Sequence, residues 1–110
     1  MIVEVIGGAD EHPEVRVVDV DDLGRLHLAL GEVTDEEADE ALRAAGIGRL
    51  EDAETGVLDT EALRAAAQQQ GVDGDWERRF ADMVELARQK GWTDDGGTSL
   101  KVHVESAAGA

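Results

Sequence analysis

The sequence has no cysteine and no tyrosine, and it holds a single proline. Without cysteine the chain can form neither a disulfide nor a thiolate metal site. The aromatic residues are Trp76, Phe80 and Trp92, and the apolar fraction of 42% is otherwise mainly Ala, Val and Leu. We therefore expect a thin, aliphatic core. A chain of 110 residues has the usual size of one domain.

Long apolar runs are also missing, and none approaches the length that a bilayer-spanning helix needs. The first residues, Met1 to Val5, lack the basic region and following apolar stretch of a secretory signal. We therefore expect a cytoplasmic chain. It should form a single domain over residues 1–105, followed by a flexible tail at residues 106–110.

Basic residues are scarce, with 10 Lys and Arg against 26 Asp and Glu, for a net charge of −16. Residues 1–55 hold 16 of these acids and 4 of the bases, so the first half carries most of the negative charge. This balance argues against direct binding of nucleic acid and against anionic membrane surfaces, because both depend on Lys and Arg. A partner attracted by charge would be basic. The alternative is that the acidic surface serves only solubility or salt adaptation.

Four segments rich in β-branched or alternating apolar residues predict strands. They are Met1–Ile6, Glu14–Val20, Arg25–Leu30 and Ser99–Glu105. A turn at Asp21–Gly24 would join the second and third as a hairpin. Arg25–Leu30 also fits helical spacing, but the segment is short and Gly24 precedes it, so we favour a strand. A further short strand is predicted at Arg49–Glu51.

Three helices are predicted between these strands. Thr34 and Glu37 form a capping box that begins the first helix, and Gly46 follows its end. The second begins at Asp59 or Thr60 and runs to about Gln70. The third is capped by Asp73 or Asp75 and ends before Gly91; its apolar stripe is Trp76, Phe80, Met83, Val84 and Ala87.

These elements predict an α+β fold, since each half-buried strand and amphipathic helix needs a partner layer. We expect a two-layer sandwich in which about three helices cover a small, mostly antiparallel sheet. The strands at the two ends of the chain should lie near each other.

The residues give little sign of catalysis. His12, His27 and His103 lack the spacing of a zinc motif, and neither serine lies in a nucleophile elbow. We therefore expect no cofactor and no bound metal, and an enzyme is the less favoured reading. The alternative is a small enzyme or a ligand- or metal-binding domain. Its site would lie around His12 or His103 with nearby carboxylates.

The densest cluster of acids lies at the start of the first predicted helix, with no base among them. It consists of Glu32, Asp35, Glu36, Glu37, Asp39 and Glu40. The helix dipole and a pair between Asp39 and Arg43 would stabilise part of this charge. The functional interpretation is a non-catalytic protein-interaction domain that binds or inhibits a basic partner, such as a toxin or a nucleic-acid-binding protein. A homodimer formed through the Trp76–Phe80–Met83 helix is a further alternative.

Overall fold

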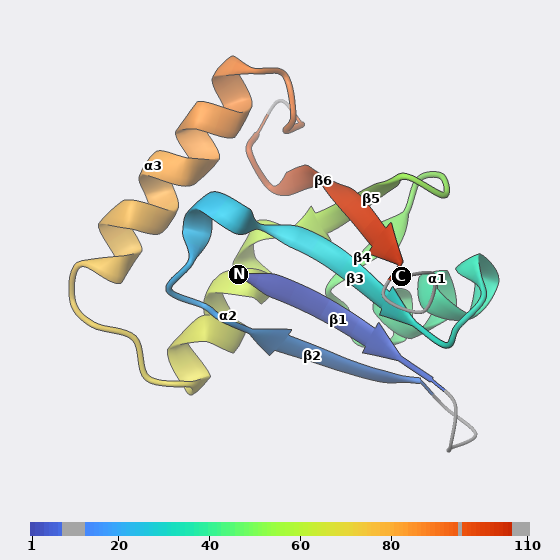
Figure 1. Ribbon diagram of the computed structural model, residues 1–110. Coiled ribbons are helices and arrows are strands. Elements are labelled where there is room, and N and C mark those ends of the chain that lie inside the picture. Colours follow the sequence, from blue (N-terminus) through green and yellow to red (C-terminus); the bar gives the residue numbers. More distant parts are fainter. Residues whose placement is uncertain (8–12, 95, 107–110) are drawn as a thin grey trace.

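The computed structural model describes residues 1–7, 13–94 and 96–106 (Figure 1). The strands are β1 (Ile2–Ile6), β2 (Glu14–Val18), β3 (His27–Gly31), β4 (Gly48–Leu50), β5 (Thr55–Asp59) and β6 (Ser99–Ser106). The helices are α1 (Asp35–Ala44), α2 (Thr60–Gln69) and α3 (Trp76–Gln89), with a short 3-10 helix, η1 (Leu23–Arg25), before β3. The α+β class predicted from the sequence is confirmed.

The six strands form one mixed sheet in the order β2-β1-β3-β6-β5-β4. β1 pairs antiparallel with β2 and parallel with β3, and β3 pairs parallel with β6. On the other side β6 is antiparallel to β5, which is antiparallel to β4. Three of the five pairings are antiparallel, as expected for most of the sheet, and the two at its centre are parallel, so the sheet is mixed. The first and last strands lie close together, separated by β3.

The predicted hairpin between the second and third strands is wrong, because β2 and β3 lie on opposite sides of β1. η1 takes up Leu23 and Gly24 of the expected turn at Asp21–Gly24, and the chain there passes the start of β1. The Met1 ammonium donates to the Asp22 carbonyl, and the His27 N–H donates to the Met1 carbonyl at 3.3 Å. These contacts carry the chain across to the far side of β1.

The sheet curls like half of a barrel (Figure 1), so the two-layer sandwich is not confirmed. Helices α1 and α2 both lie behind the sheet, towards opposite ends of it, while α3 runs along the end at which β1 begins. The buried side chains come from the central strands and from one face of each helix. They include Val3, Val5, Leu28, Leu58, Leu100, Val102, Leu42, Leu63, Trp76 and Phe80.

The helix ends agree with the residues that predict them. Thr34 and Glu37 form the capping box of α1, and Asp59 caps α2 by accepting from the Ala62 N–H at 2.8 Å. Asp75 precedes α3, although its side chain makes no capping hydrogen bond. After α1 the chain reverses through Gly46 at φ +71°, a left-handed conformation that costs glycine little.

Side chains cover both edges of the sheet. At one edge the Gln70 side-chain amide donates to the Val17 carbonyl at 2.6 Å. At the other edge Asp39 accepts from the Leu50 N–H at 2.8 Å, and α1 packs against β4. Unpaired backbone groups on an edge strand invite pairing with another chain. The Gln70 and Asp39 side chains therefore satisfy a backbone group at each edge, which leaves fewer such groups free to pair with another chain.

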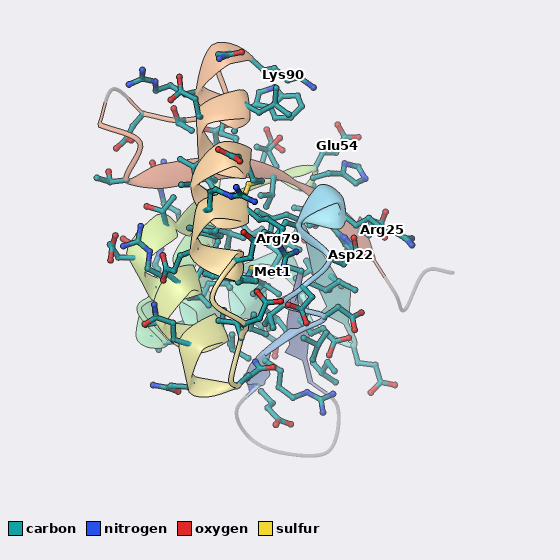
Figure 2. All side chains as sticks on the ribbon, turned by 90° about the vertical axis from the view of Figure 1, so that its left-hand side faces the viewer. Met1, Asp22, Arg25, Glu54, Arg79 and Lys90 are labelled. Carbon is teal, nitrogen blue, oxygen red and sulfur yellow. The ribbon has the colours of Figure 1, made fainter. Side chains whose placement is uncertain are left out.

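Trp76 fixes α3 to the rest of the domain. Its side chain is fully buried, its indole Nε1–H donates to the Val20 carbonyl at 2.7 Å, and its ring stacks on Phe80 with centroids 4.8 Å apart. One turn later Arg79 donates to the Asp21 carbonyl at 3.2 Å. The N-terminal half of α3 is therefore fixed to the β2–η1 connection, and Figure 2 shows Arg79 on the viewer-facing helix above Met1.

Candidate functional site

The acidic cluster predicted from the sequence lies where β3 gives way to α1. Glu32 follows β3 at φ +55°, a left-handed conformation that is uncommon for a residue with a side chain. Thr34 then starts the helix: its hydroxyl accepts from the Glu37 N–H at 3.1 Å, and the Glu37 carboxylate accepts from the Thr34 N–H at 2.9 Å. The cluster therefore occupies the positive end of the helix dipole, which stabilises carboxylates there.

The helix geometry separates these acids into outward and lateral positions. Ala38 and Leu42 are the buried positions of α1. At 100° per residue, Glu36 and Glu40 lie on the opposite side of the helix from them. The exposed members of the cluster are Glu32, Asp35, Glu36, Glu37 and Glu40. We call these five residues the acidic face.

Asp39, the sixth predicted residue, differs from the acidic face because it has partners inside the molecule. Its carboxylate accepts from the Leu50 N–H at 2.8 Å and from the Arg43 Nε–H at 2.8 Å. The Leu50 hydrogen bond and then the Arg43 guanidinium hold the pKa of Asp39 below its ordinary value. Asp39 joins α1 to β4, and this contact leaves its carboxylate less available to a partner than its neighbours are.

Most of the basic side chains contact acids in other parts of the fold. Counting only pairs among the described residues, seven of the ten lie within 4 Å of a carboxylate. Arg79 alone lies near Asp21, Asp73 and Asp75. In the described part of the chain, no ion pair involves a residue of the acidic face. The charge of Glu32, Asp35, Glu36 and Glu40 is therefore directed to solvent, while the Glu37 carboxylate also accepts from the Thr34 N–H.

The three histidines lie in different settings. His12 falls outside the described residues, together with Asp10 and Glu11. His27 is paired inside the sheet: its Nδ1 lies 2.8 Å from the Arg25 carbonyl and its Nε2 3.4 Å from the Glu105 carboxylate. His103 is exposed on β6 and lines a groove. Over residues 1–7, 13–94 and 96–106, no three His, Asp or Glu side chains are grouped as a metal site would require.

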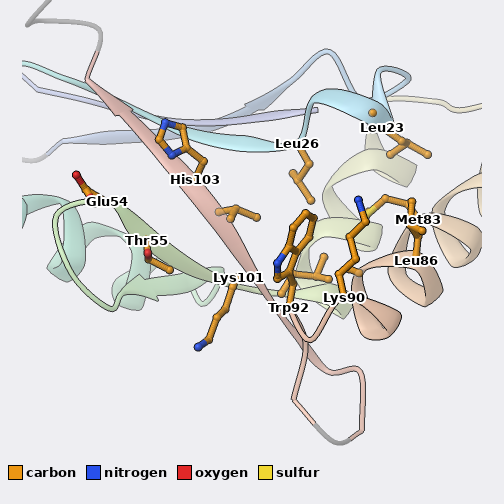
Figure 3. Close-up of a pocket in the computed structure, with 14 residues that line it drawn as sticks. Leu23, Leu26, Glu54, Thr55, Met83, Leu86, Lys90, Trp92, Lys101 and His103 are labelled. Carbon is orange, nitrogen blue, oxygen red and sulfur yellow. The ribbon is translucent and has the colours of Figure 1, made fainter.

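The groove has a volume of about 630 Å³ and opens between η1, α3 and β6 (Figure 3). Apolar side chains line much of it, namely Leu23, Leu26, Met83, Leu86, Ala87, Leu100 and Val102. The remaining walls carry Glu54, Thr55, Lys90, Trp92, Lys101 and His103. Leu86 and Trp92 are 53% and 49% exposed, and they are the two exposed large apolar residues of the described chain.

Sequence reasoning did not find this groove, because its residues come from segments far apart in the chain. Two signals were present in the sequence. The chain has only two lysines, Lys90 and Lys101, and its second tryptophan lies just beyond the predicted end of the third helix. No single segment contains enough of these residues to form a recognisable motif.

None of the helices in the described part of the chain has the length and apolar character that crossing a membrane requires. Comparison of the chain with protein-family models, with curated proteins and with solved structures found no significant match.

Proposed function

We propose that this chain is a non-catalytic protein-interaction domain that binds a basic partner through the acidic face of α1. The observation that carries the proposal is the absence of any ion pair at the acidic face within the described residues, although seven of the ten bases pair elsewhere. Carboxylates directed to solvent can meet Lys and Arg of another protein without first breaking internal pairs.

The position of these acids suits recognition of a basic surface. They lie within nine residues, and Glu36 and Glu40 are one helical turn apart on the outward side of α1. Like charges at this spacing destabilise a helix by a few tenths of a kcal/mol per pair. A partner bearing Lys or Arg would relieve this repulsion and gain electrostatically accelerated association. Asp39 would hold the acidic face in place through its contact with β4.

A matched pair of triple variants tests the proposal. One carries Glu32→Gln, Glu36→Gln and Glu40→Gln. The control carries Glu14→Gln, Asp82→Asn and Glu85→Gln, all exposed acids on other elements. Each triple variant changes the net charge from −16 to −13. A difference in binding between the two triple variants therefore depends on the position of the removed charges and not on the net charge.

The immobilised wild type and both variants are exposed to an extract of the source cells at about 50 mM and about 0.5 M salt, which strongly changes screening. We expect a basic protein that the wild type and the control retain at low salt, and that the α1 variant loses. Retention by all three chains alike, or retention unchanged by salt, would contradict recognition through the acidic face.

A further inference from the structure

The two edge strands of the sheet differ in length and in cover. β4 has three residues and packs against α1. β2 has five residues, and Figure 1 shows it as the outermost strand, with the end of α2 close beside it. An edge strand presents backbone groups that can pair with a further strand. β2 is therefore the edge at which this sheet can be extended.

The backbone groups of β2 point alternately towards β1 and away from it. The Gln70 side-chain amide donates to the Val17 carbonyl from beyond the edge, so Val17 points outward. Because successive residues of a strand alternate, Val15 also points outward, whereas Glu14 and Arg16 point towards β1. Within the described residues, no hydrogen bond engages the Val15 N–H, the Val15 carbonyl or the Val17 N–H. These groups are open to a partner strand.

The side chains of β2 place one acid and one base along this edge. Glu14 and Arg16 lie on the face of the sheet opposite to the half-buried Val15 and Val17, which pack against the core. Arg16 lies 3.6 Å from Glu4 and 4.0 Å from Glu14. The Arg16 and Glu14 side chains are 50% and 67% exposed. Pairs this exposed contribute little, so both groups can contact charges from outside.

A second copy of β2, placed antiparallel with the two Val15 residues opposite each other, pairs these charges. In this register Glu14 lies opposite Arg16 of the second copy, and Arg16 lies opposite Glu14 of the second copy. Both cross-strand pairs then have opposite charge, which is stabilising. Shifting the register by one residue would place Arg16 opposite Arg16, which is destabilising. Charge complementarity therefore selects the register centred on Val15.

The hydrogen-bonding groups agree with the same register. The two Val15 residues both point outward, so they would exchange two N–H···O=C bonds. The next outward position places Val17 opposite Pro13 of the second copy. Proline has no N–H, so it makes no demand on the Val17 carbonyl, which already accepts from Gln70. The Val17 N–H is free to donate to the Pro13 carbonyl, and the two-fold symmetry repeats this bond.

We propose that two copies of this chain associate through β2 into a dimer with one continuous sheet, in the antiparallel register centred on Val15. Such a contact is isologous, and its two-fold axis runs perpendicular to the sheet. The helices of both copies therefore stay on the same side. This inference does not depend on the proposed function, because β2 and the acidic face share no residue.

The net charge of −16 on each copy opposes association. At physiological ionic strength the Debye length is about 8 Å. The Glu14 and Arg16 pairs that face each other across the joint are therefore felt more strongly than acids elsewhere on the two copies. Measurements at about 0.15 M salt consequently test the edge itself.

A matched pair of variants separates the edge from the net charge. Glu14→Arg places like charges opposite each other at both cross-strand pairs, yet it changes the net charge of each chain from −16 to −14. Glu85→Arg makes the same change at an exposed position of α3. By sedimentation equilibrium we expect a wild-type dissociation constant on the order of 10 µM, since the joint is small. Glu14→Arg should weaken it at least tenfold, and Glu85→Arg should not weaken it.

A charge exchange then tests the register. Glu14→Arg combined with Arg16→Glu restores opposite charges at both cross-strand pairs, so its affinity should return to within about threefold of the wild type. The substituted side chains are all exposed, so the fold should be retained, which circular dichroism checks.

Amide hydrogen exchange of the wild type locates the joint without any substitution. The Val15 and Val17 amides should exchange severalfold more slowly at about 500 µM than at about 20 µM protein, because exchange then requires the monomer. The Arg16 amide points towards Glu4 on β1, so its exchange should not depend on protein concentration. This alternation along β2 would not arise from a dimer formed elsewhere.

Four outcomes would overturn the proposal. A wild type that stays monomeric up to about 500 µM excludes the dimer. Association strengthened alike by Glu14→Arg and Glu85→Arg would mean that net charge governs it. A charge-exchanged variant that binds no better than Glu14→Arg would contradict the register. A dimer in which Val15 and Val17 exchange at the same rate at both concentrations would be joined through another surface.

Discussion

Replacing Asp39 should destabilise the domain more than replacing any acid of the acidic face. Asp39→Ala removes the acceptor of the partly buried Leu50 N–H, and an unsatisfied group of this kind costs about 1–3 kcal/mol. Loss of the exposed pair with Arg43 adds about 0.3–0.5 kcal/mol. We expect a total of about 2 kcal/mol at pH 7, or about 8 °C in the midpoint of thermal unfolding.

The assay is urea unfolding followed by circular dichroism, with Glu40→Ala as the matched control on the same helix. Glu40 is exposed, and its replacement should change stability by less than about 0.5 kcal/mol. Asp39→Asn keeps an oxygen that can accept from Leu50, so it should lose about half as much as Asp39→Ala. Equal stability of Asp39→Ala and Glu40→Ala would refute the view that Asp39 joins α1 to β4.

The pH dependence gives an independent check on Asp39. The pKa of this carboxyl is lowered in the folded protein, first by the Leu50 N–H and then by Arg43. The unfolded chain therefore binds the proton more readily, and the stabilisation is complete above the unfolded pKa of about 3.9. It is lost as the pH falls through the folded value. The stability gap between wild type and Asp39→Asn should narrow below about pH 4, and a gap that widened there would contradict this assignment.

Two further substitutions test the packing. Trp76→Phe leaves the buried Val20 carbonyl without its indole donor and should lower the free energy of unfolding in urea by about 2–3 kcal/mol. Trp92→Phe should lower it by less than about 1 kcal/mol. A larger loss for Trp92→Phe than for Trp76→Phe would contradict the assignment of Trp76 as the anchor of α3. Gly48→Ala would place a Cβ 2.2 Å from the Val57 carbonyl oxygen and should cost at least about 2 kcal/mol. In Gly74→Ala no atom lies within 4 Å of the new Cβ, so the stability should hardly change. Equal losses of stability in Gly48→Ala and Gly74→Ala would argue against a close contact between β4 and β5.

Local features of the fold could be read from the sequence because they depend on neighbouring residues. The capping box of Thr34 and Glu37 and the stripe of Trp76 and Phe80 each act within one helix. Leu100, Val102 and Val104 alternate along the predicted strand, and all three are buried. Such patterns identify an element and its buried face.

Pairing between strands could not be predicted in the same way. Period-two alternation indicates which side of a strand is buried but not which strand lies beside it. Asp21–Gly24 was therefore interpreted as a hairpin turn, whereas the connection there crosses from one side of β1 to the other. The curl of the sheet depends on all six strands together, so no single segment encodes it.

The two candidate sites also differ in how far the local sequence predicts them. The acidic face comes from one continuous segment, and composition alone revealed it; its role as a binding surface stays a prediction. The groove brings Leu26, Leu86 and His103 together from β3, α3 and β6 or their immediate approaches. Nothing in the local sequence of any one of these residues distinguishes it from an ordinary surface or core position.

The place of β6 in the sheet has a consequence for how the protein is made. β6 alone connects the ladder of β2, β1 and β3 to the ladder of β5 and β4. Until residues 99–106 have left the ribosome, β3 and β5 lack the strand that joins them in the finished sheet. Folding to completion must follow the arrival of this segment. Shortening the chain before residue 99 should yield a species prone to self-association rather than a smaller stable domain.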